Sequence, residues 1–490
     1  MSGTRTRTTT YAHAFEDAAR IPPAERAALL GGKGAGLVRM TEAGLPVPPG
    51  FVLSTAAGLA FLENGEPPPG LRAEVRAQMD RLARRLGRVF GGGPSPLLVS
   101  VRSGAAVSMP GMMDTLLNIG LVPAAAAALD ARTGDSGYAR RSARALAEAH
   151  AGLGLGPVSG DPYEQLFTAI DAVFSSWRTE RATEYRRLHG LPDEGGTAVT
   201  VQAMVLGDLP GPGVSGTGVL FTRDPVTGEP GAVGEFLPDG QGSGLVDGTR
   251  TPGPLADLAA RAPGVHADLL RHAAALEAMY ADMCDIEFTV EDGTLWLLQV
   301  RPGKRTDAAA ARIALDLVAE GTIDRAEAVR RAGDRTGAVA SAAPGTDLGP
   351  VLCTGLPASP GIATGRVVFD ADAALDMADS GETAVLVREF TEPSDIHGMA
   401  AAGAILTATG GRMSHAAVVA RELGVPCVCG AAALAFEAGT VRIGGRPLAA
   451  GDVVTVDGTG GRVHGPAAAA VTTTPARTAY QERLAEWAGA

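Results

Sequence analysis

The sequence predicts a multidomain protein of mixed α/β and α+β class. Its 490 residues are too many for one hydrophobic core and indicate two to four domains. The composition is globular, with 46% apolar and 20% charged residues, and helical and strand-like patterns both occur along the chain. Residues 333–350 form an Ala/Gly/Pro-rich stretch that is long for a loop inside a compact domain. We expect this stretch to tether a mobile domain.

Charge and cysteine content argue against several classes of function. The formal charge of −12 argues against a nucleic-acid or anionic-membrane partner. No apolar run reaches the ~18 residues that a membrane span needs. The first residues lack the apolar core of a signal peptide, so we expect a cytoplasmic protein. Four cysteines make no disulfide framework in so long a chain, and Cys427 and Cys429 are expected to be buried free thiols on one strand.

The N-terminal region contains a glycine-rich segment with an isolated lysine. Gly31–Gly36 is predicted to be a flexible loop between short helices at residues 22–30 and 37–43. Lys33 and Lys304 are the only lysines among 42 basic residues, and both stand next to glycine. Because lysine presents a compact point charge to phosphate, both positions favour nucleotide contact. A plain turn is the alternative at residues 31–36, since the spacing is not that of a phosphate loop.

Two segments after residue 90 carry further signals. Residues 96–105 are predicted to be a buried strand that delivers Arg102 at its end. The segment 108–118 contains three methionines and a glycine, and such a loop can cover a ligand and adapt to it. Residues 122–190 are predicted to be mostly helical and carry no recognisable chemistry.

Two acidic residues form a candidate metal site. Residues 283–301 predict a hairpin in which strand alternation places Asp285 and Glu287 on one face. Mg²⁺ takes one or two carboxylates together with phosphate oxygens, so this pair suits that ion. Gln299 and Arg301 share a face of the return strand. An ordinary exposed strand face is the alternative interpretation.

The stretch Thr407–Gly424 predicts a strand, a tight glycine turn and a helix. Ser414 is a good N-cap, and Gly424 ends the helix. His415 therefore sits in the first helical turn, where backbone N–H groups without partners favour an anion. This is a poor environment for a protonated imidazole and a good one for a phosphorylated imidazole. The alternative is a polar residue at an exposed helix start.

Seven groups of residues together are similar to those of a known family. They are Gly31-Gly-Lys-Gly-Ala with Pro46–Phe51, Ser100-Val-Arg-Ser-Gly-Ala with Met109-Pro-Gly-Met-Met-Asp-Thr115, Phe221-Thr-Arg-Asp-Pro, Asp285-Ile-Glu-Phe-Thr, Gln299 with Gly303-Lys-Arg, Leu356-Pro-Ala-Ser-Pro-Gly361 and Ser414-His-Ala-Ala-Val-Val-Ala-Arg421. The set resembles the pyruvate, phosphate dikinase family of phosphoenolpyruvate-utilising enzymes. The groups follow nearly the same order as in that family over about residues 30–460.

The resemblance implies an ATP-grasp nucleotide-binding domain followed by a swivelling β/α phosphohistidine domain. The predicted domains are residues 1–305 (nucleotide-binding, with a helical insertion at about 122–190), 306–350 (helical segment and linker), 351–466 (phosphohistidine) and 467–490 (a tail with a short helix).

Each candidate site residue takes a family role by the same resemblance. The implied nucleotide contacts are Lys33, Arg102, Glu235, Glu287, Gln299 and Arg301, and the implied Mg²⁺ ligands are Asp285 and Glu287. The implied catalytic residues are His415, which is phosphorylated, Arg102 and Arg301. In the family, ATP and phosphate yield AMP, pyrophosphate and phosphohistidine. The mobile domain then carries the phosphoryl group to pyruvate in a C-terminal barrel.

Three departures from the family pattern matter. No α/β repeat of ~250 residues follows residue 465, so we expect the pyruvate- or phosphoenolpyruvate-binding barrel on a separate partner protein. Met413 stands where the family has threonine. Ser243-Gly244 replaces an acidic pair, although Asp247 is nearby.

The leading hypothesis is an ATP- and phosphate-dependent phosphotransferase that autophosphorylates His415 and passes the phosphoryl group to that barrel. A different small-molecule acceptor is one alternative, although residues 305–350 leave no room for a dedicated acceptor domain. A non-catalytic nucleotide-sensing subunit is the other.

Overall fold

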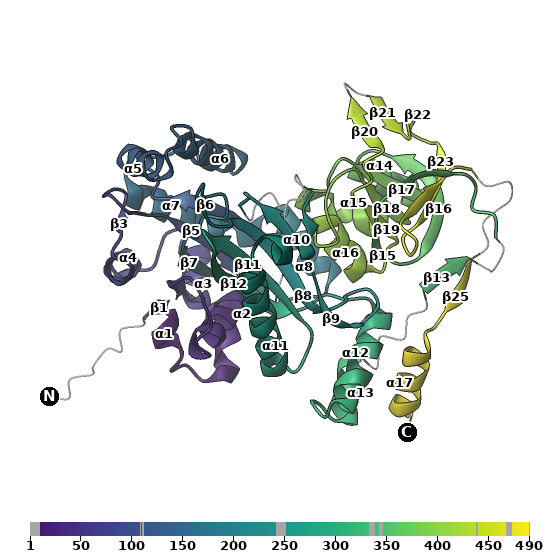
Figure 1. The fold of residues 1–490 in the computed structure, drawn as a ribbon, viewed down its shortest axis with the longest axis horizontal. Coiled ribbons are helices and arrows are strands. Elements are labelled where there is room, and N and C mark those ends of the chain that lie inside the picture. Colours follow the sequence, from purple (N-terminus) through teal and green to yellow (C-terminus); the bar gives the residue numbers. More distant parts are fainter. Residues whose placement is uncertain are drawn as a thin grey trace. The chain divides into compact units, whose positions relative to one another are not determined.

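The computed structural model divides the chain into two compact units. It describes residues 10–107, 109, 112–241, 251–332, 339–342, 346–437, 440–466 and 473–489. One unit comprises residues 1–212 with 296–301, and the other comprises residues 213–295 with 302–490 (Figure 1). The division at residue 212 falls inside the region expected to be one nucleotide-binding domain. The domain boundary expected at residue 305 stays a prediction.

The first unit is built on an antiparallel five-stranded sheet. The strand order is β1 (Ala12–Ala14), β2 (Gly50–Leu53), β7 (Ala198–Ala203), β5 (Val99–Gly104) and β6 (Thr115–Ile119). Two short strands, β3 (Val89–Phe90) and β4 (Pro96–Leu97), pair separately. Every residue of β2, β5 and β7 is buried, including the polar residues of β5 and β7, so these strands lie at the centre of the unit.

Eight α-helices of this unit are described. They are α1 (Phe15–Ala18), α2 (Pro23–Glu42), α3 (Thr55–Asn64), α4 (Leu71–Leu86), α5 (Pro123–Thr133), α6 (Tyr138–Gly152), α7 (Pro162–Ser175) and α8 (Glu180–Leu188). The predicted helical character of residues 122–190 is therefore confirmed. Helices α3, α4 and α7 bury apolar side chains in one core with the sheet, including Phe61, Met79 and Phe174.

The predicted loop at Gly31–Gly36 is wrong. Residues 32–36 are helical, and the two helical segments of α2 meet at a kink at Gly31, which has φ 68° and ψ 166°. A Cβ at Gly31 would lie 1.7 Å from the carbonyl oxygen of Gly104, so only glycine permits this close approach. Leu30 and Leu37 on either side are fully buried. Tertiary packing thus overrides the low helix propensity of the glycines.

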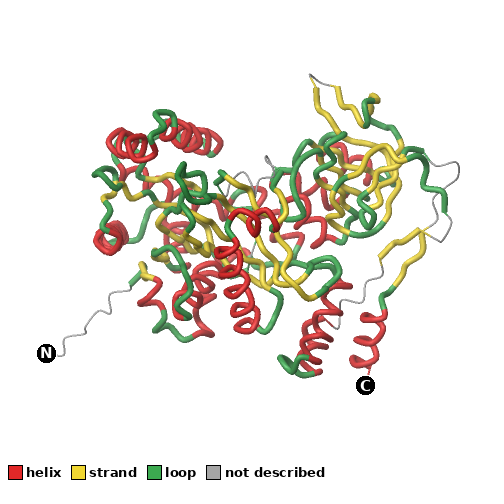
Figure 2. Tube along the Cα trace, in the orientation of Figure 1, coloured by secondary structure: helices red, strands yellow, loops and turns green. Residues whose placement is uncertain are grey.

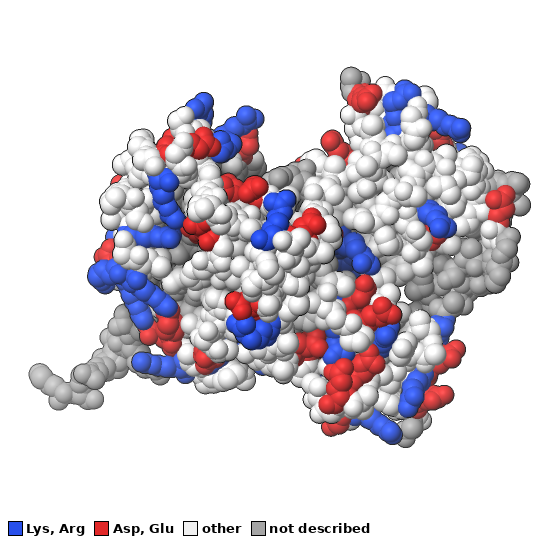
Figure 3. Space-filling model, viewed as in Figure 1, with Lys and Arg blue, Asp and Glu red and all other residues white. Residues whose placement is uncertain are grey.

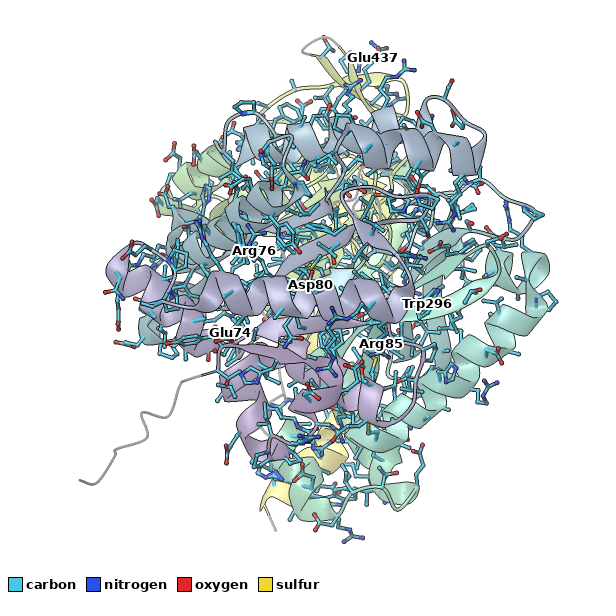
Figure 4. All side chains as sticks on the ribbon, turned by 90° about the vertical axis from the view of Figure 1, so that its left-hand side faces the viewer. Glu74, Arg76, Asp80, Arg85, Trp296 and Glu437 are labelled. Carbon is cyan, nitrogen blue, oxygen red and sulfur yellow. The ribbon has the colours of Figure 1, made fainter. Side chains whose placement is uncertain are left out.

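Charged side chains of α4, among them Glu74 and Arg76, which are labelled in Figure 4, contact neighbouring elements. The Glu74 carboxylate accepts the backbone N–H groups of Tyr11 and Ala12, each at 2.8 Å, and so secures the start of β1. The Arg76 guanidinium lies 4.1 Å from the centre of the Tyr163 ring. Glu74 and Arg76 of this helix thus have structural partners.

The second unit begins with an antiparallel sheet in the order β10 (Gly253–Pro254), β9 (Pro230–Pro238), β8 (Gly216–Arg223) and β11 (Cys284–Glu291). Strand β12 (Thr294–Pro302) follows the turn after β11, as predicted, and residues 296–301 of it belong to the first unit. The described helices of this part of the second unit are α10 (Ala256–Arg261), α11 (Pro263–Tyr280), α12 (Asp307–Ala319) and α13 (Arg325–Ala332).

An eight-stranded mixed sheet forms the core of the C-terminal half of this unit. Its order is β14 (Val351–Thr354), β24 (Arg462–His464), β23 (Val453–Asp457), β16 (Ile362–Val368), β17 (Ala384–Arg388), β18 (Ala404–Thr407), β19 (Cys427–Cys429) and β15 (Leu356–Ser359). Strands β16 to β19 are parallel neighbours. Helices α14 (Ala371–Asp379), α15 (Ile396–Ala401) and α16 (His415–Leu423) lie against the sheet (Figure 2). A small antiparallel sheet of β20 (Leu434–Glu437), β21 (Thr440–Ile443) and β22 (Arg446–Leu448) extends from it.

The expected tether contains structure that the sequence pattern did not reveal. Strand β13 (Val339–Ala342) pairs antiparallel with β25 (Thr473–Ala476), and the paired residues Ala342 and Thr473 are 131 positions apart in the chain. The short helix predicted within the tail at residues 467–490 is α17 (Ala479–Gly489), which packs on α12 and α13 through Leu484 and Trp487. The chain therefore enters and leaves the eight-stranded sheet region through paired strands.

Two further observations concern surface charge and helix hydrophobicity. Acidic and basic side chains are interspersed over the face drawn in Figure 3, in keeping with the net charge of −12. No helix among the described residues is both long and apolar enough to cross a membrane.

We predict that Leu484→Ala releases α17 from its support. Leu484 is fully buried against α12 and α13, and truncating a buried leucine costs about 2–5 kcal/mol. Hydrogen exchange across residues 479–489 should accelerate, while Glu486→Ala on the exposed side of the same helix should leave it unchanged. Unaltered exchange in Leu484→Ala would show that the packing of α17 contributes little.

Candidate active site

His415 occupies the position that its sequence context predicts. Strand β18 leads into a turn in which Gly410 has φ 93°, and α16 then begins at His415. Ser414 stands at the N-cap position, but its hydroxyl donates to the carbonyl oxygen of Gly411 at 2.9 Å instead of accepting a helix N–H. Gly424 ends the helix with φ 70°. His415 is only 8% exposed, so the alternative of an exposed polar residue is wrong.

A second loop reaches the imidazole from the neighbouring strand. Strands β17 and β18 are parallel, so their carboxyl ends lie at the same edge of the sheet. The loop after β17 brings the Thr391 hydroxyl oxygen to 3.0 Å from His415 Nδ1. His415 Nε2 is buried and has no hydrogen-bonding partner among the described residues. Sequence reasoning missed Thr391, because a threonine 24 positions before a histidine carries no local signal.

A small pocket adjoins the ring and is rich in hydroxyl groups. It is lined by Phe390, Thr391, Thr407, Thr409, Ser414, His415 and Ala416. These residues come from the ends of β17 and β18 and from the first turn of α16. The pocket is therefore formed wholly within the eight-stranded sheet region.

Burial determines the charge of His415. It lowers the pKa of the imidazole to about 4, and the nearby Asp395 carboxylate, which favours the protonated ring, offsets only part of this effect. Asp395 is itself held by Arg388, whose Nε lies 3.3 Å from the carboxylate. The ring is thus neutral at pH 7, and a neutral imidazole retains a nitrogen lone pair that can attack phosphorus.

Glu235 contacts the loop that precedes His415. From β9, its carboxylate accepts the backbone N–H of Arg412 at 2.7 Å. Burial raises the pKa of the Glu235 carboxyl, and the backbone N–H groups of Arg412 and Met413 oppose that shift. A Cβ at Gly411 would lie 2.2 Å from Glu235 Oε2, so glycine is needed for this approach. The observed contact of Glu235 is the one with Arg412. Its expected contact with a nucleotide stays a prediction.

Three more contacts link the same loop and helix to residues of the second unit that lie outside the eight-stranded sheet region. The Lys304 ammonium lies 2.6 Å from the Glu422 carboxylate, although its sequence context favoured nucleotide contact. An Arg412 nitrogen lies 3.5 Å from the Asp224 carboxylate. Met413 is 8% exposed and packs in an apolar cluster that includes Phe221. In this structure the residue at the family's threonine position thus has a packing role.

The two candidate metal ligands lie where predicted. Asp285 and Glu287 pair in unbroken register with Phe221 and Val219 of β8, so both carboxylates are on one face of β11. Asp285 is 3% exposed, which rules out an ordinary exposed strand face at that position. Among the described residues, no three His, Cys, Asp or Glu side chains gather closely enough to hold a metal. A donor pair of this kind fits Mg²⁺ only if phosphate oxygens complete the coordination.

Four of the candidate nucleotide-binding residues belong to the first unit: Lys33, Arg102, Gln299 and Arg301. Arg102 Nη2 donates to Gln202 Oε1 at 2.9 Å and to the Leu298 carbonyl oxygen at 2.8 Å. Gln202, which orients Arg102, was not found from the sequence because a glutamine within an apolar strand resembles any core polar residue. Arg102 is 8% exposed.

The remaining sequence signals have mixed outcomes. Cys427 and Cys429 are buried free thiols, as predicted. Met109 and Met112 are buried, and Arg181 holds their loop by donating to the Met112 carbonyl oxygen at 3.1 Å. Covering a ligand stays a prediction for this loop. Ser108, Pro110 and Gly111 lie outside the described residues, as do Ser243, Gly244 and Asp247.

Two family models match the chain. The model described as the pyruvate phosphate dikinase AMP/ATP-binding domain matches residues 27–86, 60–256 and 266–321. The model of the PEP-utilising enzyme mobile domain matches residues 381–461, which include His415. The class of protein is thus a nucleotide-binding domain of ATP-grasp type followed by a mobile domain.

Curated relatives agree with these models. The chain is 42% identical to pyruvate, phosphate dikinase of Rhizobium meliloti (strain 1021), 41% to that of Entamoeba histolytica and 40% to that of Clostridium symbiosum. Each match covers 89% of this chain and 55%, 55% and 56% of the relative, respectively. The chain belongs to the pyruvate, phosphate dikinase family. It spans about half the length of the relatives it matches.

We predict that His415 stays neutral down to about pH 5. An ordinary histidine with a pKa of 6.5 would be almost fully protonated there, whereas burial lowers this pKa to about 4. A two-dimensional NMR titration of ¹⁵N-histidine-labelled protein should show no change at His415 between pH 8 and 5. His397, which is hydrogen-bonded to Asp372 and partly exposed, serves as an internal comparison. A midpoint near 6.5 at His415 would contradict the effect of burial.

We predict that Glu235→Ala exposes the loop before His415. The variant removes the acceptor of the Arg412 N–H, and hydrogen bonds to charged groups contribute about 1.5–3 kcal/mol. Hydrogen exchange of the 410–414 backbone should accelerate at least about tenfold. Glu229→Ala, in the turn before β9, removes a carboxylate without touching the loop. Equal exchange in both variants would remove Glu235 from this role.

Proposed function

We propose that this chain is an ATP- and phosphate-dependent phosphotransferase that autophosphorylates His415. The observation that carries the proposal is a neutral imidazole at the start of α16, with Nε2 unpartnered among the described residues. Membership of the pyruvate, phosphate dikinase family supports the same chemistry.

The proposed reaction is ATP + phosphate + His415 → AMP + pyrophosphate + phosphorylated His415. His415 uses a ring lone pair to form the N–P bond. AMP departs with the α-phosphorus, and the γ-phosphorus joins inorganic phosphate as pyrophosphate. The β-phosphoryl group therefore remains on the histidine. An imidazole that is uncharged at pH 7 needs no deprotonation before attack, which is what the burial of His415 provides.

Nucleotide binding is assigned in this proposal to the candidate residues that the sequence analysis named. Lys33, Arg102, Gln299 and Arg301 would bind the nucleotide, with Arg102 and Arg301 neutralising charge on the transferring phosphoryl groups. The carboxylates of Asp285 and Glu287 would hold Mg²⁺, and the ion would supply charge neutralisation at the phosphates. Fixed positive groups and correct positioning are the main needs of phosphoryl transfer.

We further propose that a pyruvate- or phosphoenolpyruvate-binding barrel on another chain accepts the phosphoryl group. Helices α12 and α13 and strand β13 account for most of the described residues between 306 and 346, so no acceptor domain is inserted there. An acceptor that is a different small molecule would instead discharge the phosphorylated protein without any added barrel protein. A nucleotide-sensing subunit would bind ATP without forming AMP.

The deciding experiment uses ATP labelled in the β-phosphate. With Mg²⁺ and phosphate, the full chain should acquire acid-labile label, and mass spectrometry should locate it at His415. The label should be absent in His415→Asn and after chelation of Mg²⁺, and retained in His397→Asn, which removes another histidine of the same region. Unlabelled wild-type protein that still binds ATP would refute the proposal in favour of a sensing role.

A further inference from the structure

We propose that Thr391 is a positioning residue that presents Nε2 of His415 for phosphorylation. Its hydroxyl lies 3.0 Å from His415 Nδ1, and both groups are buried. The proposed role is to hold the ring orientation and to keep the proton on Nδ1, so that the lone pair is on Nε2. This inference rests on the proposed phosphorylation of His415. It assigns a role to a residue that is not in any of the seven groups named in the sequence analysis.

The backbone around Thr391 is fixed on both sides. Before it, the carbonyl oxygen of Glu389 accepts the Thr409 hydroxyl at 3.0 Å and the Thr409 backbone N–H at 2.9 Å. After it, Glu392 and Asp395 cap each other: the Asp395 carboxylate accepts the Glu392 N–H at 2.9 Å, and the Glu392 carboxylate accepts a backbone N–H in return. Thr391 is therefore held between two anchored points and is 3% exposed.

Thr391 differs from the other hydroxyl residues of the pocket in its partner. Thr407 donates to the carbonyl oxygen of Thr409 at 2.7 Å, and Thr409 donates to that of Glu389. Ser414 donates to the carbonyl oxygen of Gly411. These three hydroxyl groups thus support the backbone of the two loops. Thr391 alone of the four has a recorded hydrogen bond to the ring of His415.

A hydroxyl group suits both stages of the proposed step, because it can accept or donate a hydrogen bond. Before attack, Thr391 accepts the Nδ1–H and leaves the Nε2 lone pair directed away. When Nε2 bonds to phosphorus, the P–O bond to the leaving group breaks and its electron pair leaves with the oxygen. The ring then carries a positive charge, with the proton still on Nδ1. Loss of that proton to water gives the neutral phosphoimidazole, to which the Thr391 hydroxyl can donate.

The charged neighbours are consistent with this sequence of states. Asp395, beside the ring, favours the transient positive charge, and its carboxylate is also paired with Arg388 at 3.3 Å. Neither residue has a recorded hydrogen bond to His415, so neither can determine which nitrogen carries the proton. The contact that distinguishes the two nitrogens is the one from Thr391.

The first test reads the tautomer directly and needs no ATP. Full-length protein labelled with ¹⁵N-histidine gives two-bond ¹H–¹⁵N correlations that identify the protonated ring nitrogen, and His415→Asn assigns the His415 signals. Wild type and Thr391→Ser should show the proton on Nδ1. Thr391→Val, which keeps the shape and removes the hydroxyl, should show a mixture or the Nε2–H form. Thr407→Val removes another hydroxyl of the same pocket and should retain the wild-type tautomer.

The second test measures labelling by β-labelled ATP in rapid-quench experiments. Thr391→Val should lower the maximal labelling rate on the order of 100-fold, the typical cost of a misplaced reacting group, without changing the ATP concentration for half-maximal rate. Thr391→Ser should restore most of the rate. A rate loss shared equally by the Val and Ser variants, or accompanied by weaker ATP binding, would indicate a merely structural role and overturn the proposal.

The two tests separate the proposals from each other. If wild-type protein is not labelled, the proposed function fails, while the NMR result still decides whether Thr391 sets the tautomer. If wild type is labelled but carries its proton on Nε2, or if Thr391→Val keeps the Nδ1–H form, the role of Thr391 is refuted and the proposed function stands.

Discussion

The burial of one imidazole is the constraint on which the candidate site depends. An exposed histidine at a helix start would have a pKa near the ordinary value of 6.5. His415 is only 8% exposed, and its pKa falls to about 4. Burial at this position is possible because β17 and β18 are parallel and direct two loops to the same sheet edge. One loop carries Thr391 and the other leads to His415. The arrangement of strands therefore controls the charge of the ring.

Local pattern was a sufficient guide wherever the determinants are local. The strand, glycine turn and helix around His415 follow from a cap residue, two glycines and a helix-ending Gly424, and the structure has them in that order. The shared face of Asp285 and Glu287 follows from strand alternation alone.

Long-range contacts were beyond the reach of such reasoning. The helical state of the Gly31–Gly36 segment depends on burial of the residues beside it, and its single break depends on the approach of Gly104. Thr391 and Glu235 meet the His415 loop from 24 and 177 residues away in sequence. The pairing of β13 with β25 joins two segments whose composition indicated only linkers. In each case the structure is determined by a contact with residues distant in sequence, and not by the composition of the segment itself.

The same burial that keeps the imidazole neutral also limits access to it. Nε2 has almost no exposed surface, so a phosphoryl donor can reach it only if the elements around the pocket separate. The loop and helix that carry His415 also make contacts outside the eight-stranded sheet region: a carboxylate on backbone N–H groups at Glu235, an ion pair at Lys304 and the packing of Met413. Partly exposed ion pairs contribute about 1 kcal/mol or less, so their loss is a small cost. The internal support of the ring, from Thr391 and the capped loop behind it, lies wholly within the eight-stranded sheet region. The support of the ring would therefore be unchanged by loss of those contacts, which is what the proposed loading and unloading of a phosphoryl group would require.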